Sequence, residues 1–283
     1  MKIIGSADDV VVRLDFDHHG SWQPGQHFHI CFPSISIWQS HPFTPSSLPD
    51  PNSKIQHHTY LLRVRSGITA KLAAFGEGAC VPAVLTGPYG KALPSFEARN
   101  ILAVAGGTGV TFTLPIVMEA SRQHTELTKN AVDFVWVMRK VQDLRWLEQE
   151  FVQLQRLLDD NLALRVKIFV TRQAGLEEEH RVIHNTDEKP GSDSSVGESD
   201  AEAQSLRDLV GACSSSRYSV AFLDGHHPSM REISSDFVER ASNAGGGLEL
   251  VGSGPEAMGG DLRDAVSRIE TPERVGFCWD SRE

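Results

Sequence analysis

A short apolar segment that runs directly into a glycine-rich turn constrains this chain more than any other feature. Residues 100–105 (Asn-Ile-Leu-Ala-Val-Ala) form a nearly continuous apolar run, which is typical of a strand buried on both faces of a parallel sheet. The turn at residues 106–111 (Gly-Gly-Thr-Gly-Val-Thr) follows at once, and a helical pattern continues to about Arg122. Glycines let the backbone approach phosphate oxygens closely, and the helix start adds free N–H groups. The turn therefore predicts a pyrophosphate site. A tight strand-to-helix turn without a ligand is the alternative, because Phe112 replaces the third glycine of GxGxxG.

Strand and helix patterns alternate through the rest of this half. Residues 132–138 predict a second buried strand, residues 164–170 a third strand and residues 248–251 a later one. Between the first two, residues 144–158 carry leucines and a phenylalanine on one helical face. This β-α-β-α-β order predicts a parallel sheet with helices on both sides.

The first ~94 residues follow a different pattern, with short strand-like runs and no long helix. The runs are separated by Gly and Pro turns, and they cover residues 10–16, 26–32, 60–65 and 81–85. Short strands at this spacing predict a small antiparallel barrel ahead of the parallel-sheet domain.

Composition narrows the class of protein. Residues 177–202 contain nine acidic and two basic side chains, so most of the net charge of −10 lies there. The rest of the chain has a small negative net charge, which argues against a nucleic-acid surface. We interpret the acidic, Ser/Gly-rich stretch at about 175–215 as a disordered insertion. Four scattered cysteines without a CxxC spacing predict no metal site. No segment approaches the ~18 apolar residues of a membrane span, so we expect this chain by itself to be soluble.

A second candidate site is the tetrapeptide His41-Pro42-Phe43-Thr44, which follows a strand-like run and opens a Pro/Ser-rich loop. A flat, partly apolar ring such as isoalloxazine needs a rigid backbone, apolar surface and one hydroxyl, which Pro42, Phe43 and Thr44 supply. A strand-end turn packed by one aromatic ring is the alternative.

Two further segments carry phosphate-binding or cleft-forming chemistry. Residues 63–72 combine Arg63 and Arg65 with a glycine turn, and an Arg fork suits a pyrophosphate, although solvated arginines are the alternative. Residues 252–258 place a Gly/Pro turn after a buried strand. Since ligands bind beyond the carboxyl ends of strands in open α/β sheets, we expect this turn and the turn at 106–111 to share a cleft.

Five motifs in order, HPFT, RxGxT, Gly-Pro-Tyr-Gly at 87–90, GGTGVT and Gly-Pro-x-x-Met, resemble the reductase half of fungal ferric-chelate reductases. These belong with the NADPH oxidases in the ferredoxin–NADP reductase-like superfamily. The similarity runs from about Val10 to Trp279. It implies an antiparallel FAD-binding barrel over residues 1–96 and a parallel-sheet NADPH-binding domain over 97–283.

The resemblance also implies a role for individual residues. His41, Pro42, Phe43 and Thr44 would bind the isoalloxazine, with Thr44 near its reactive N5. Arg65, Gly67 and Thr69 would bind the pyrophosphate of FAD. The pyrophosphate of NADPH would be bound by Gly106, Gly107, Thr108, Gly109 and Thr111. The nicotinamide ring would contact Gly254, Pro255 and Met258. Arg139 follows the second sheet strand, where an Arg can pair with the 2′-phosphate of NADPH. Trp279 is the candidate for stacking on the flavin, with a place in the core as the alternative.

The chain departs from the family pattern at several positions. Ser253 occupies the place of a frequent cysteine, so its role in catalysis would rest on a hydroxyl, and Ile68 replaces an aromatic residue. Residues 225–228 (Gly-His-His-Pro) match a Gly-Arg-Pro motif only loosely. The membrane domain with its haem-ligating histidines is not in this sequence.

The resemblance therefore predicts an FAD-dependent oxidoreductase that takes hydride from NADPH and passes single electrons onward. The acceptor would be a haem membrane domain or a ferric chelate, and the chain would lie at the cytoplasmic face of the plasma membrane. An NADPH-oxidase-type module that reduces dioxygen and a degenerate, non-catalytic binding or regulatory domain are the alternatives.

Overall fold

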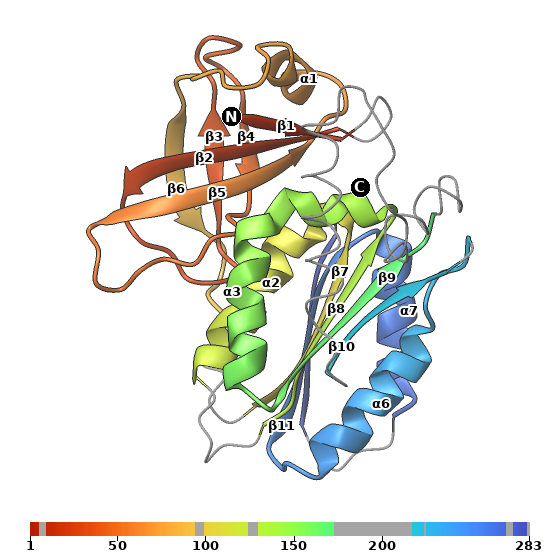
Figure 1. The fold of residues 1–283 in the computed structure, drawn as a ribbon. Coiled ribbons are helices and arrows are strands. Elements are labelled where there is room, and N and C mark those ends of the chain that lie inside the picture. Colours follow the sequence, from red (N-terminus) through yellow and green to blue (C-terminus); the bar gives the residue numbers. More distant parts are fainter. Residues whose placement is uncertain are drawn as a thin grey trace, which may run out of the picture.

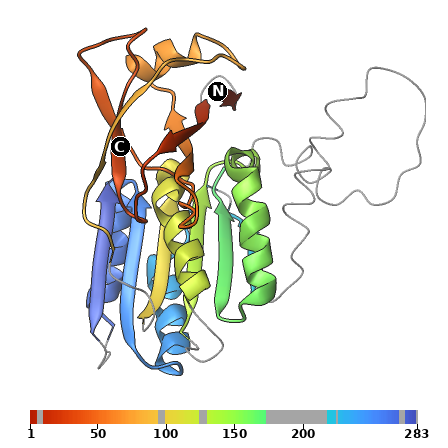
Figure 2. The same cartoon turned by 90° about the vertical axis from the view of Figure 1, so that its left-hand side faces the viewer.

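The protein folds into a small β-barrel that sits over one end of a three-layer α/β domain (Figures 1 and 2). The computed structural model describes residues 1–5, 10–93, 99–123, 130–172, 217–223, 225–269 and 274–281. An antiparallel barrel followed by a parallel-sheet domain is the predicted fold class, and the structure confirms it.

The barrel consists of two three-stranded antiparallel sheets. One has the order β1 (Lys2–Ile4), β2 (Val11–His19), β5 (Ile55–Arg63), and the other β4 (Ser40–Phe43), β3 (His27–Cys31), β6 (Val84–Tyr89). Buried and half-buried residues alternate along β3, so that Phe28 and Ile30 point into the barrel. The short helix α1 (Ile68–Ala73) follows β5.

Two parts of the barrel differ from the sequence-based expectation. His41, Pro42 and Phe43 lie in strand β4 rather than in a loop, and they pair with β3. Pro42 is tolerated because β4 is an edge strand, where a missing N–H costs no ladder hydrogen bond. Gly87 and Pro88, expected to form a turn, likewise lie inside the edge strand β6.

The second domain is built on a six-stranded, fully parallel sheet with the order β10-β9-β8-β7-β11-β12. The strands are β7 (Arg99–Gly106), β8 (Val132–Met138), β9 (Leu164–Val170), β10 (Tyr218–Phe222), β11 (Gly247–Gly254) and β12 (Val275–Ser281). Helices α2 (Val110–Gln123) and α3 (Glu148–Asp160) cover one face, and α6 (Met230–Ser242) and α7 (Glu256–Ser267) cover the other (Figure 1).

The buried strands β8 and β9 have the bounds that their apolar runs predict. The helix expected over 144–158 instead begins as a 3-10 segment, η2 (Val141–Leu147), which continues into α3. Gly252 and Ser253, expected in a turn, form the end of β11. Strands β10 and β12 at the two sheet edges were not predicted, because both are only partly buried.

The domains share one hydrophobic core. Val11 of β2 and Leu61 of β5 are buried in the same cluster as Phe112 of α2 and Trp136 of β8. The domain boundary predicted between residues 96 and 97 and the acidic insertion at 175–215 both lie outside the described residues. Within the described ranges, no helix combines the length and apolar character that a membrane span requires.

Candidate functional site

A cavity of about 1000 Å³ lies between the barrel and the carboxyl edge of the parallel sheet. Its walls come from the ends of β7 and β8, from the turn after β11, and from β4 and β5 of the barrel. In open α/β sheets, this edge is where ligands bind. Its size falls within the range of pockets that hold small molecules and cofactors.

The glycine turn after β7 forms the floor of this cavity. It folds as a 3-10 segment, η1 (Gly107–Gly109), that leads directly into α2, and Gly107 has a φ of 53°, which favours glycine. The turn packs tightly on β11, because a Cβ at Gly109 would lie 2.1 Å from the carbonyl oxygen of Ser253. A Cβ at Gly106 would lie 2.8 Å from Cδ of Pro255. The two glycine segments that the sequence assigns to one cleft are therefore in direct contact.

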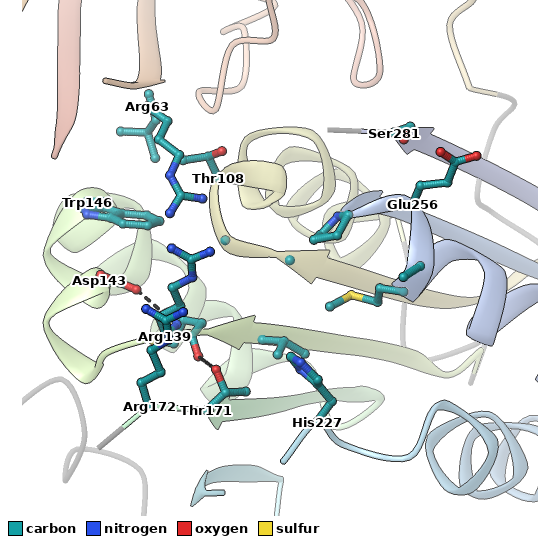
Figure 3. Close-up of a pocket in the computed structure, with 18 of the residues that line it drawn as sticks. Arg63, Thr108, Arg139, Asp143, Trp146, Thr171, Arg172, His227, Glu256 and Ser281 are labelled. Carbon is teal, nitrogen blue, oxygen red and sulfur yellow. Dashed lines mark hydrogen bonds between the residues drawn. The ribbon is translucent and has the colours of Figure 1, made fainter. Parts of the chain in front are cut away.

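The cavity is basic at one end and acidic at the other. Arg63, Arg139, Arg172 and Trp146 lie on one side, and Glu256 and Ser281 lie on the opposite side (Figure 3). The basic end suits the phosphates of a dinucleotide, since Arg binds phosphate oxygens as a planar fork.

Backbone hydrogen bonds fix the position of the arginines at the basic end. The buried Asp143 accepts the backbone N–H groups of Arg139 and Lys140 at 3.3 and 3.2 Å. The N–H of Arg172 donates to the carbonyl of Arg139 at 2.8 Å. Arg139 and Arg172 thus follow two adjacent strands, and both lie at the cavity.

The flavin motif contributes two of its four residues to the cavity wall. Pro42 and Phe43 line it, whereas His41 and Thr44 do not line it in the described structure. Thr44 is buried, with 7% of its surface exposed. Nε2 of His41 is also buried and has no hydrogen-bond partner within the described residues. A buried ring nitrogen of this kind is costly unless a ligand or water satisfies it.

The RxGxT segment is only partly directed at the cavity. Arg65 lines it, whereas Gly67 and Thr69 are not among the described residues that do. Gly67 has a φ of 69° just before α1. Oγ1 of Thr69 accepts the backbone N–H of Arg65 at 3.1 Å, so the Thr69 hydroxyl holds the Arg65 loop.

The residues after β11 also divide between cavity and core. Pro255 and Met258 line the cavity. Ser253 is fully buried at the end of β11, and its hydroxyl lies 3.3 Å from Oδ2 of Asp280. Trp279 packs between β11 and α7, because a Cβ at Gly252 or Gly259 would lie 2.3 and 2.5 Å from its ring. Trp279 is thus half-buried and packs against the core of the parallel-sheet domain.

Two sequence matches cover most of the chain. Residues 98–267 match the ferric reductase NAD binding domain, and residues 3–93 match an FAD-binding domain. The chain belongs to the ferric reductase family. It therefore carries an FAD-binding domain and an NAD(P)-binding domain, as the order of its motifs predicts.

Curated proteins with similar sequences support this family assignment. The chain is 29% identical over 168 residues to ferric reductase transmembrane component 5 of Saccharomyces cerevisiae, a match that covers 56% of this chain and 23% of that protein. It is 24% identical over 261 residues to ferric/cupric reductase transmembrane component 2 of the same yeast. This match covers 87% of this chain and 33% of that protein. A superoxide-generating NADPH oxidase heavy chain of Dictyostelium discoideum is 23% identical to this chain. The match covers 56% of this chain and 26% of that protein. The chain spans a third or less of these relatives.

A solved structure supports the fold of this ferric reductase-family chain. Ferredoxin-NADP+ reductase from Plasmodium falciparum, with 2′P-AMP, matches with a TM-score of 0.59 at 12% identity. The match covers all of this chain and 92% of that protein. At this identity, the likeness concerns the ferredoxin–NADP reductase-like fold alone.

The residues present fit both groups that the family implies. Pro42 and Phe43 give the cavity wall an apolar surface that suits the face of a flavin ring. The glycine turn leaves room for a pyrophosphate, and the arginines supply its counter-charge.

The sequence-based prediction missed two residues of the cavity, Arg172 and Trp146. Arg172 follows a predicted buried strand just as Arg139 does, so the same rule would have found it, whereas Trp146 resembles any core aromatic of an amphipathic helix.

Proposed function

We propose that this chain is the FAD- and NADPH-binding half of a ferric-chelate reductase, which takes hydride from NADPH and passes single electrons onward. One observation supports this function above all others. A single cavity is lined by the flavin motif (Pro42 and Phe43), by the glycine turn (Gly106 to Thr108) and by Pro255 and Met258. Two cofactors held at these places would meet in the same space, as hydride transfer requires.

Each wall of the cavity has a distinct task in this proposal. Residues Gly106 to Thr111 hold the NADPH pyrophosphate, and Arg139 pairs with the 2′-phosphate. Gly254, Pro255 and Met258 bound the nicotinamide, and the buried Ser253 hydroxyl supports that wall from β11.

The barrel holds the flavin. Residues His41 to Thr44 seat the ring, and Arg65, Gly67 and Thr69 bind its pyrophosphate. Bound FAD supplies the redox chemistry that converts one hydride into two single electrons. A role for Trp279 at the flavin would require its ring to leave the Gly252–Gly259 groove.

The acceptor lies outside this chain. Because the chain spans a third or less of its curated relatives, whose names describe transmembrane components, we propose that it works beside a haem-containing membrane domain. That domain would pass electrons to a ferric chelate, and this chain would lie at the cytoplasmic face of the membrane.

The direct test uses the purified chain with added FAD. A yellow protein with flavin absorbance that reduces ferricyanide with NADPH is the expected result. A folded, colourless and inactive protein would exclude the enzyme and favour a non-catalytic binding domain. The variant Gly260→Ala, whose new Cβ would meet nothing within 4 Å, serves as a control that should behave like the wild type.

A module that reduces dioxygen is the second candidate, and the Dictyostelium NADPH oxidase relative favours it. Superoxide formation by the full-length protein, with no reduction of a ferric chelate, would replace the ferric reductase by this oxidase.

A further inference from the structure

Trp136 of β8 reaches the glycine turn from the inside of the α/β domain. Its side chain is fully buried, yet its indole Nε1–H donates a hydrogen bond to the carbonyl oxygen of Gly107 at 3.0 Å. This carbonyl belongs to the first residue of η1, the turn at the cavity floor. Trp136 itself does not line the cavity as described.

The same carbonyl also accepts the backbone N–H of Val110 within the turn. The indole is thus a second, buried donor that helps determine how the turn presents its backbone. In a planar trans peptide, the C=O of one residue and the N–H of the next point in opposite directions. With the Gly107 carbonyl held toward the buried indole, the N–H of Thr108 points away from it. Gly107 and Thr108 both line the cavity, so this N–H is available to an anionic group there.

The hydrogen bond from Trp136 matters more because Gly107 has a φ of 53°. Glycine visits many backbone conformations at similar free energy, so a glycine turn without an external partner is conformationally heterogeneous. A buried donor with a carbonyl partner selects one orientation, since breaking the bond would leave the indole N–H unsatisfied.

The indole packs against aromatic residues of η2 and α3, which in turn contact the barrel. Its ring lies 5.4 Å from the ring of Phe151 in a stacked arrangement, and 6.2 Å from that of Trp146. The carbonyl of Trp146 accepts a hydrogen bond from Nη1 of Arg13, a barrel residue, at 2.9 Å. The orientation of Trp136 therefore depends on the packing of the barrel on η2 and α3.

We propose that Trp136 is a positioning residue for dinucleotide binding: its indole N–H orients the Gly107–Thr108 peptide so that the Thr108 N–H meets the pyrophosphate of the nicotinamide cofactor. The inference rests on the proposed function, because it requires that NADPH occupies this cavity. It assigns to Trp136 an effect on the pyrophosphate alone, with none on the 2′-phosphate.

The test compares two ligands that share the 2′-phosphate and differ in the pyrophosphate. The variant Trp136→Phe keeps an aromatic ring and removes the N–H donor. Calorimetric titration of the FAD-loaded protein should show that NADP+ and NAD+ both bind about tenfold more weakly, which is the scale of one lost hydrogen bond. Binding of adenosine 2′-monophosphate, which has neither phosphate of the pyrophosphate, should not change.

Trp22→Phe is the matched control. Trp22 is a buried barrel tryptophan whose Nε1 has no partner among the described residues. This substitution makes the same reduction in ring size without removing a hydrogen bond, so NADP+ affinity should stay at the wild-type value. If Trp136→Phe does not fold, spectra of the wild-type indole N–H groups serve instead. The Trp136 resonance should shift with NADP+ and stay in place with adenosine 2′-monophosphate.

Three results are decisive. Selective weakening of NADP+ and NAD+, or the selective shift of the resonance, supports the role of Trp136. Wild-type NADP+ affinity in Trp136→Phe, or equal weakening of NADP+ and adenosine 2′-monophosphate, overturns it while the proposed function stands. A wild-type protein that binds neither ligand overturns the proposed function and this inference together.

Discussion

Arg13 of the barrel and Glu150 of α3 form a buried ion pair that crosses from one domain to the other. Nη1 and Nη2 of Arg13 lie 2.8 and 2.9 Å from the two carboxylate oxygens of Glu150, and each residue is only 6% exposed. Burial alone would lower the pKa of Arg13, but hydrogen bonds to Glu150 and Asp15 and their charges raise it above its ordinary value. Arg13 therefore stays charged, and its contact with Glu150 joins the barrel to the corner between η2 and α3.

Breaking this pair should destabilise the protein strongly. Glu150→Gln leaves a buried guanidinium short of a counter-charge, which we expect to cost about 3 kcal/mol in the free energy of unfolding. Urea denaturation measures this cost. Asp159→Asn, at an exposed position on the same helix, is the control and should change stability by no more than about 0.5 kcal/mol. Equal stability of the two variants would show that the pair contributes little to domain packing.

The barrel should lose stability in mild acid because of His58. This side chain is fully buried among rings, with its centroid 4.2 Å from that of Trp22. Burial, and then the charges of His18 and His57, lower the pKa of His58 from 6.5 to about 4. Between these values the unfolded chain takes up a proton that the folded state excludes, so stability is full above pH ~6.5 and falls as the pH approaches ~4.

The loss over this window should be roughly 3 kcal/mol, since one pKa unit corresponds to about 1.4 kcal/mol. Urea denaturation at several pH values, compared between the wild type and His58→Phe, isolates this contribution because other titrating groups cancel. Parallel stability curves for the two proteins would contradict the prediction.

Gly109 should tolerate no side chain. A Cβ there would lie 2.1 Å from the carbonyl oxygen of Ser253, so Gly109→Ala must separate the glycine turn from β11. We expect NADP+ affinity to fall at least tenfold, together with a lower melting temperature. Gly260→Ala, at an open helical position in α7, is the matched control and should stabilise by up to about 1 kcal/mol. Unchanged NADP+ binding in Gly109→Ala would mean that this contact does not shape the site.

Arg139 should decide between the two nicotinamide cofactors. Its side chain is exposed at the cavity, and its backbone N–H is fixed by Asp143. A charge-assisted pair with the 2′-phosphate is worth about tenfold or more in affinity. Arg139→Ser should therefore weaken NADP+ and 2′-phospho-AMP by at least tenfold and leave NAD+ unchanged, as titration can show. Arg156→Ser, exposed on α3, should change none of the three affinities, and an equal loss of NADP+ and NAD+ in Arg139→Ser would contradict the assignment.

Local sequence patterns determined much of the fold and of the cavity position in this protein. The apolar runs of β7 and β8 and the glycine turn after β7 are local signals, because a strand buried on both faces is largely apolar. The same patterns brought the segments around Gly106 and Pro255 to one cleft, since parallel strands end at a common edge. The motif order from His41 to Met258 then identified the family.

Contacts between distant residues were decided only by the tertiary structure. Arg13 and Glu150, or Trp136 and Gly107, are far apart in the chain, and nothing in their neighbouring residues indicates the partner. The edge position of β4, which allows Pro42 to lie in a strand, depends on sheet order. The place of Trp279 depends on two glycines in other elements that leave a groove for its ring. Periodicity reports how a segment is buried, but only packing in three dimensions determines which residues meet at the cavity.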